Sequence, residues 1–219
     1  MLRHLILVPT DRERRIVVPH LEGGMGASRR VELCGFGLVA AAARTSQLLA
    51  RDPAARVTLV GIAGRFDDRL AVGSAYRFDE VACYGVGVGS GDNFMGAEAV
   101  GWVQWPGDPA DPGREIGDLT PCATAAASTA PRAGLLLSSC AAAASVDDVR
   151  QRRRLYPAAM AEDMEGFGVA LACRLHGVPV DIVRGISNTV GDRDKARWRV
   201  ETALEAAAAV ALTLMVDAS

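Results

Sequence analysis

The stretch Val31-Glu32-Leu33-Cys34-Gly35-Phe36-Gly37, read together with the residues that follow it to Gly64, decides the fold. Residues 31–35 predict a short strand, and the Ala-rich residues 38–51 predict a helix that begins directly after the glycine turn. The apolar residues 56–64 predict a second strand that again ends in glycine. A strand, a turn, a helix and a strand in this order form a β-α-β unit, which implies parallel pairing.

The same alternation continues on both sides of this unit, without a linker or a repeat. Strands are predicted at residues 2–8, 134–139 and 178–186, and as two pieces separated by residues 77–80 within 72–88, with a closing helix at 197–215. Residues 89–118 are rich in Gly, Pro and Asp, which predicts an irregular region. We therefore expect a single α/β domain over residues 1–219, with a mixed, mostly parallel twisted sheet flanked by helices.

The composition argues against several classes of function. A net charge of −2 provides no basic footprint for nucleic acid and no polybasic patch for a membrane. The five cysteines lack C-x-x-C spacing and the three histidines are scattered, so no metal ion is expected. Gly35-x-Gly37 lacks the third glycine of a dinucleotide fingerprint, and no organic cofactor is implied. Since no apolar run is long enough to span a membrane, we expect a soluble cytoplasmic protein.

Two polar side chains stand at the ends of neighbouring elements in the second half of the chain. Glu165 stands at the start of an Ala-rich helix that runs to residue 175, and Asn188 follows the next strand. The helix macrodipole alone would favour an acid at Glu165. It does not explain Gly166 and Gly168, which cost helix stability and suggest that something approaches the helix end closely. The two polar groups can therefore converge in one cleft.

Residues 162–173 and 183–188 resemble the signature of the purine nucleosidase and phosphorylase superfamily. The resemblance implies that Met164 packs on the ribose, that Glu165 accepts hydrogen bonds from the ribose hydroxyls, and that residues 184–188 hold the purine. The segments 35–42 and 61–64 look like the two glycine turns of the family. The second turn, which contains Gly64, lines the purine and ribose cleft in that family.

Glu13 follows the first predicted strand at the spacing where the superfamily places a glutamate that polarises the attacking water. Cleavage of an N-glycosidic bond passes through a sugar with oxocarbenium character, and a carboxylate can both take the proton of water and stabilise that charge. The alternative is an ordinary solvated charge, since Arg12, Arg14 and Arg15 surround Glu13 in what we expect to be a surface loop. We predict that Glu13 is catalytic.

Asn188 stands where adenine-specific members of the superfamily carry aspartate. Adenine offers an amino donor and a ring acceptor on the edge that this residue meets, whereas hypoxanthine and guanine offer two acceptors. A carboxylate would oppose those lone pairs, but the amide nitrogen of asparagine donates to them. We therefore predict that Asn188 participates in catalysis by binding a 6-oxopurine.

Residues 162–167 and 188–194 are most similar to the futalosine hydrolase branch of the superfamily, and Gly91-Asp92-x-Phe94 resembles a Gly-Asp-Gly-Phe element there. That branch acts on a hypoxanthine nucleoside whose 5′ side carries a carboxyphenyl ketone. Phe94 is the predicted stacking residue for this group, and the cation that binds it is sought among Arg65, Arg69 and Arg77. Residues 98–132 match the family least.

Hydrolysis is favoured over phosphorolysis because the Gly-Asp-Pro-x-Arg run of the phosphorylases is absent and position 62 is Ile, without a hydroxyl. The partners implied are a small nucleoside and water, and the resemblance also implies a homodimer. Two alternatives stay open, namely a nucleosidase for inosine or methylthioinosine-like substrates, and a non-catalytic nucleoside-binding module that would need Glu165 and Asn188 but not Glu13.

Overall fold

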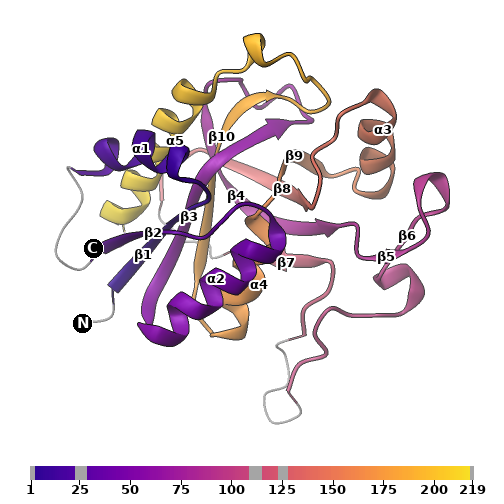
Figure 1. The fold of residues 1–219 in the computed structure, drawn as a ribbon, viewed down its shortest axis with the longest axis horizontal. Helices are drawn as coiled ribbons and strands as arrows, with labels where there is room; N and C mark the ends of the chain where they lie inside the picture. The colour runs from indigo at the N-terminus through magenta and orange to yellow at the C-terminus, as the bar shows by residue number, and fades with distance from the viewer. Residues whose placement is uncertain (1–2, 23–28, 109–114, 123–127, 218–219) are drawn as a thin grey trace.

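The strands and helices follow one another along the whole chain (Figure 1). The computed structural model describes residues 3–22, 29–108, 115–122 and 128–217. The strands of the main sheet are β1 (Arg3–Val8), β2 (Arg29–Leu33), β3 (Ala54–Arg65), β4 (Ala75–Tyr84), β7 (Leu119–Pro121), β8 (Arg132–Ser139), β9 (Ala159–Asp163) and β10 (Val180–Thr189). The helices are α1 (Asp11–Leu21), α2 (Leu38–Arg51), α3 (Val146–Leu155), α4 (Gly166–Leu175) and α5 (Val200–Asp217). A small hairpin is formed by β5 (Gly87–Val88) and β6 (Met95–Gly96).

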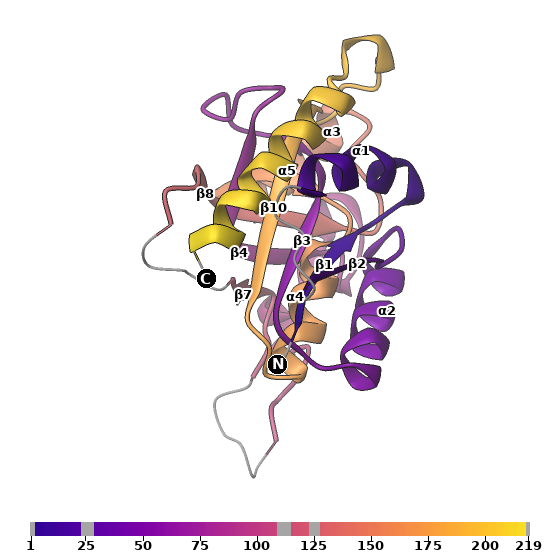
Figure 2. The ribbon, with the colours of Figure 1, turned by 90° about the vertical axis from the view of Figure 1, so that its left-hand side faces the viewer.

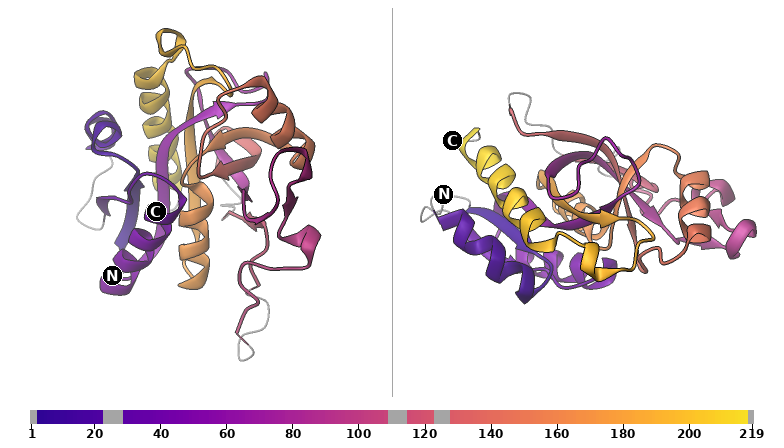
Figure 3. Two further views of the ribbon diagram at one scale, coloured as in Figure 1. Left: turned by 45° about the vertical axis from the view of Figure 1, so that its right-hand side comes forward. Right: turned by 90° about the horizontal axis from the view of Figure 1, so that it is seen from above.

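Five strands form a closed circuit at the centre of the fold. The order β10-β4-β8-β9-β3 closes because β10 also pairs with β3, and the view from above in Figure 3 shows the resulting ring. β1 and β2 extend the sheet from β3, and β1 pairs in parallel with both of its neighbours. Within the main sheet, pairing is parallel except at β10–β4, β3–β9 and β4–β7. The predicted single-domain α/β fold with a mixed sheet is confirmed.

Helices cover the sheet from two sides, as Figure 2 shows. α1 and α5 pack together on one side, and α2 and α4 pack together on the other. Close packing depends on glycine, because a Cβ at Gly168 would collide with the Leu38 carbonyl of α2, and one at Gly185 with the Ala203 carbonyl of α5. Gly166 faces Asp163 in the same way. Gly166 and Gly168 were predicted to allow something to approach the start of the helix closely. The groups that do so are Asp163 and the backbone of α2.

Several local predictions are confirmed and others are wrong. The helix at 38–51 has the predicted bounds, and the strand at 134–139 lies within β8. Residues 77–80 do not separate two strands, because they lie inside β4 with Arg77 and Phe78 buried. Glu13 and its arginines lie on α1, where a surface loop was expected. Among the described residues no helix is both long and apolar enough to cross a membrane.

A buried group of charges joins three strands of the circuit, where Asp181 of β10 meets Arg56 of β3 and Arg77 of β4. Asp181 is fully buried, its Oδ1 lies 2.9 Å from Nε of the buried Arg77, and its Oδ2 accepts a hydrogen bond from Arg56. Removing one partner of a buried ion pair leaves charge without compensation in a medium of low dielectric constant. The carboxylate of Asp181 is therefore expected to stabilise the packing of β10 against β3 and β4.

Asp181→Asn should lower the free energy of unfolding by about 3–5 kcal/mol, since the shape is kept while the buried charge is lost. Urea denaturation followed by circular dichroism measures this change. Asp147→Asn is the matched control, because Asp147 is 79% exposed in its pair with Arg150 and should cost at most about 1 kcal/mol. Equal effects of the two substitutions would contradict the prediction.

Candidate active site

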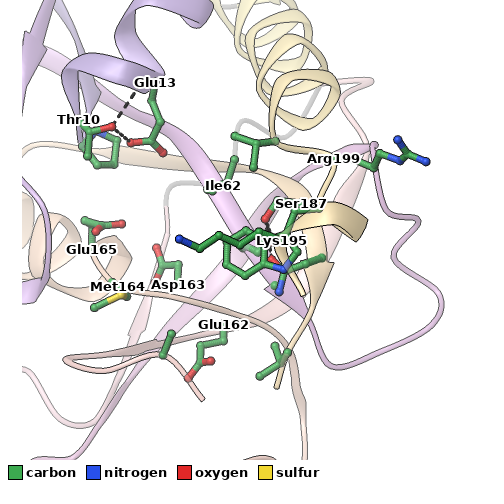
Figure 4. A pocket seen from close by; sticks show the side chains of 18 of the residues that line it. Thr10, Glu13, Ile62, Glu162, Asp163, Met164, Glu165, Ser187, Lys195 and Arg199 are labelled. Carbon is green, nitrogen blue, oxygen red and sulfur yellow. Dashed lines mark hydrogen bonds between the residues drawn. The ribbon is translucent and has the colours of Figure 1, made fainter. Parts of the chain in front are cut away.

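A cavity of about 630 Å³ opens where strands β1, β3 and β10 end and helices α1, α4 and α5 begin (Figure 4). Its volume lies in the range of about 300–1,000 Å³ that is typical of small-molecule sites. Five predicted residues from four separate places in the sequence line it together, namely Glu13, Gly64, Met164, Glu165 and Asn188. The structure therefore brings together the predicted site with the exception of Phe94.

Glu13 reaches the cavity from the first turn of α1. Thr10 caps this helix: its hydroxyl accepts a hydrogen bond from the Glu13 amide (3.3 Å) and donates one to Glu13 Oε2 (2.6 Å). Glu13 is buried at 8% exposure and points into the cavity. Within the described residues its Oε1 takes no hydrogen bond from protein, so this oxygen is available to a molecule in the cavity. Thr10-x-x-Glu13 has the spacing of a capping box, which could have predicted the helix.

Glu165 stands at the N-cap position of α4, and its carboxylate accepts a hydrogen bond at each oxygen. The Gly37 amide donates to Oε1 at 3.0 Å, and Arg184 Nη2 donates to Oε2 at 3.2 Å. Burial raises the pKa of Glu165 to about 7, the nearby Asp163 carboxylate adds to this rise, and Arg184 opposes it. The Gly35-x-Gly37 turn therefore serves the site by presenting a backbone amide to a carboxylate.

Arg184 and Asp163 form a buried brace beneath Glu165. Arg184 is fully buried, and its Nε donates to Asp163 Oδ2 at 2.9 Å. Asp163 also accepts hydrogen bonds from the Ser138 hydroxyl and, at 2.8 Å, from the Gly166 amide. The brace needs Gly61, because a Cβ there would collide with Arg184 Nη1 and lie 3.1 Å from Glu13 Oε1. Arg184 therefore supports Glu165 through buried ion pairs and is not among the residues that line the cavity.

Asn188 lies half-buried at the end of β10, and its amide orientation is fixed from two sides. The Ser187 hydroxyl donates to Oδ1 at 2.7 Å, and Nδ2 donates to the Thr189 carbonyl at 2.8 Å. A flipped amide would set Oδ1 against the Thr189 carbonyl, lone pair against lone pair. The Nδ2 group keeps a second N–H for a ligand. Gly64 lies beside this amide, and a Cβ on it would come within 3.0 Å of Val190 Cγ2 and 3.4 Å of Asn188 Nδ2.

Phe94 does not line this cavity. Its ring lies 5.6 Å from the ring of Tyr84, and it borders a second, smaller hollow with Tyr156. The Gly91-Asp92-x-Phe94 element is fastened to α3 instead, because Gln151 and Arg154 donate to the carbonyls of Gly91 and Asp92. The structure therefore does not support Phe94 as a stacking residue in this cavity.

The arginines considered for the 5′ group are engaged elsewhere. Arg65 binds Asp68 and the Leu70 carbonyl, Arg69 binds Asp67, and Arg77 lies against Asp181. The cations that line the cavity are Arg12, Arg193, Lys195 and Arg199. Three of these four lie on the segment between β10 and α5. Basic residues recur in the sequence soon after residues 184–188, and this signal was missed in the sequence analysis.

Comparison with known proteins places the chain in a family. The family model described as Phosphorylase superfamily matches residues 12–217. The chain belongs to this superfamily. The predicted resemblance is thus confirmed at the level of the family.

Curated relatives of the chain fall into two groups. Futalosine hydrolase of Streptomyces coelicolor is 35% identical over 153 residues, which cover 68% of this chain but only 60% of that protein. Futalosine hydrolase of Thermus thermophilus is 29% identical over 226 residues, with 97% and 95% of the two chains covered. A 5′-methylthioadenosine/S-adenosylhomocysteine nucleosidase of Tolumonas auensis is 33% identical over 181 residues, with 80% of this chain and 73% of that protein covered. Both groups agree with the predicted enzyme class.

Solved structures support the fold. The native structure of futalosine hydrolase from Helicobacter pylori matches the chain with a TM-score of 0.77 at 17% identity, and the match covers 100% of this chain and 99% of that one. At this identity the likeness concerns the arrangement of strands and helices.

Proposed function

We propose that the protein hydrolyses the N-glycosidic bond of futalosine, releasing hypoxanthine and dehypoxanthine futalosine as a step of menaquinone biosynthesis. The observation that carries this proposal is the fixed amide of Asn188, which offers an N–H to the cavity that Glu13 and Glu165 also line. Curated relatives named futalosine hydrolase support the choice of substrate.

In the proposed mechanism each polar group has a separate task. Glu165 accepts hydrogen bonds from the ribose hydroxyls while Met164 packs on the sugar, and Asn188 donates to the O6 and N7 edge of the purine. Glu13 Oε1 takes a proton from a water that attacks C1′, and its negative charge stabilises the oxocarbenium character of the sugar. The C1′–N9 bond breaks, its electron pair leaves with the purine, and the proton released by water ends on the purine.

A nucleosidase for 5′-methylthioadenosine is the second candidate, because the Tolumonas auensis relative is as similar to the chain as the futalosine hydrolases are. Asn188 argues against it, since an amide donor does not match the amino group of adenine. A nucleosidase for inosine or a methylthioinosine-like nucleoside would share the same base recognition. A non-catalytic nucleoside-binding module would have no use for the free oxygen of Glu13.

Purified protein incubated with futalosine, inosine and methylthioadenosine, with chromatography of the released purine, separates these candidates. Hypoxanthine release from futalosine at the highest kcat/KM supports the proposal, and release of adenine alone contradicts it. Rates in phosphate and in phosphate-free buffer should be equal, because hydrolysis uses water as the nucleophile. Light scattering tests the homodimer, which stays a prediction, as does the cytoplasmic location.

The role proposed for Glu165 predicts a pH dependence. Ribose hydroxyls donate more strongly to the carboxylate than to the protonated acid, which keeps fewer acceptor sites and no charge, and burial raises the pKa of this group to about 7. Binding therefore improves as pH rises, so kcat/KM should increase through about pH 7, and this rise should be absent in Glu165→Gln. Steady-state assays from pH 5.5 to 8.5 measure both curves. The same rise in the variant would assign it to another group.

A further inference from the structure

The charged groups of the cavity are divided between its interior and its mouth. Buried acids line the interior, namely Glu13, Glu162, Asp163 and Glu165. The segment between β10 and α5 contributes the cations Arg193, Lys195 and Arg199, followed by the exposed acid Glu201 at the start of α5. This segment therefore brings a net positive charge to the cavity wall.

Lys195 is the only lysine among the 24 lysine and arginine residues of the chain, and it lies at this mouth. Its amine extends across the cavity toward the side that holds Met164 and Glu165, whereas Arg199 points away (Figure 4). Lys195 is exposed, and it forms no ion pair with an acid in the part of the chain that the structure describes. Its positive charge is therefore available to a ligand.

The segment that carries Lys195 is braced by its own side chains. Asp192 accepts hydrogen bonds from the Asp194 amide at 2.9 Å and from Arg197 at 2.8 Å, and its carbonyl accepts one from Trp198 Nε1 at 3.1 Å. The bond to Nε1 fixes the indole of Trp198, which lines the cavity. The ion pair with Asp192 compensates the charge of Arg197, which does not line the cavity. The segment thus places the fixed indole of Trp198 near the unpaired amine of Lys195.

Arg193 is another cation of this segment that lines the cavity, and its guanidinium lies over the Trp198 ring at 5.3 Å. That arrangement uses Arg193 to cover one side of the indole. Lys195 is left as the cation directed into the cavity. A flat group against Trp198 that ends in an anion would match the two features.

We propose that Lys195 binds an anionic group at the far end of the 5′ substituent and so selects nucleosides with an acidic 5′ extension. This inference rests on the proposed nucleosidase function and adds to it a residue that recognises the 5′ substituent of the substrate. The carboxylate of futalosine is the group that it would bind.

The first test compares futalosine with inosine, which has no 5′ extension. In Lys195→Gln the ratio of kcat/KM for futalosine to kcat/KM for inosine should fall about 10- to 100-fold, the effect of one charge-assisted hydrogen bond. Lys195→Arg should recover most of the ratio because the charge is kept. Arg150→Gln is the control, because it removes a positive charge from an exposed pair with Asp147 outside the cavity, and it should leave the ratio unchanged. An unchanged ratio in Lys195→Gln would overturn the inference.

A second test uses the single lysine and does not depend on turnover. An amine-selective acetylating reagent modifies Lys195 and the α-amino group of the chain, and peptide mass spectrometry separates the two. Futalosine should slow acetylation of Lys195 more than fivefold, and inosine should not. If the wild type hydrolyses neither nucleoside but futalosine still protects Lys195, the hydrolase proposal fails and the binding role stands. Equal acetylation with and without futalosine would overturn the inference even in an active enzyme.

Discussion

Glu13→Gln should lose about 10²–10⁴-fold in turnover while the protein keeps its affinity for ligand, the loss expected when a general base is removed. The glutamine keeps the size of the side chain, and its amide oxygen can still accept the Thr10 hydroxyl that now binds Oε2. The group that remains at the cavity can no longer take a proton from water. Single-turnover rates and ligand titrations on the same preparation measure the two effects separately.

Asp11→Asn is the matched control for Glu13→Gln. Asp11 lies on the first turn of the same helix, where it pairs with Arg14 and Arg15 at the surface. Its turnover should stay close to that of the wild type. If Glu13→Gln also turned over at the wild-type rate, Glu13 would have no part in the chemistry, and the binding-module alternative would gain support.

Asn188→Asp should lower kcat/KM for a hypoxanthine nucleoside by up to about 10⁴-fold, the scale for a site whose buried polar groups are mismatched with the substrate. The amide that donates to Thr189 O is replaced by an oxygen facing that carbonyl and the acceptors of the purine. This opposition favours the protonated acid and so raises the pKa of the new side chain. Activity should therefore recover in part as pH falls, and an adenine nucleoside should lose less.

The measurement for Asn188→Asp is kcat/KM for matched adenine and hypoxanthine nucleosides at two pH values. Asn93→Asp makes the same chemical change in an exposed turn outside the cavity and should leave the ratio unchanged. An unchanged base preference in Asn188→Asp would mean that Asn188 does not read the purine. The choice of a 6-oxopurine would then lose its main support.

The sequence was sufficient to predict a helix, a strand or a cavity residue where the signal for it lies within one short stretch. The helix at 38–51 shows its Ala-rich pattern and its glycine turn within one stretch, and Glu165 and Asn188 stand beside recognisable element ends. β9 gave no such signal, because Ala159–Asp163 is short and ends in two acids. It is a strand because it pairs with β8, which precedes it beyond α3, and with β3, which is far away in the sequence.

Phe94 and the candidate arginines do not line the cavity, and the reason is different. Phe94 and the candidate arginines were chosen for the chemistry of their side chains, but their positions depend on how the strands connect. Arg77 lies within β4, where its side chain is buried against Asp181. The ring of Phe94 packs against the ring of Tyr84. Lys195 reaches the cavity because the segment after β10 turns back over it. Neither periodicity nor spacing contains that information.

The position of β10 in the sheet has a consequence for how the chain is made. This strand pairs with β3 on one side and β4 on the other, yet it is the last of the described strands to leave the ribosome. Until it arrives, a nascent chain presents the unpaired edges of two long strands, the kind of surface on which chains aggregate. The same strand brings Arg184 and Asn188, so closing the ring also completes the site. A translation product that stops before residue 180 would thus be inactive and open to capture by chaperones or proteases.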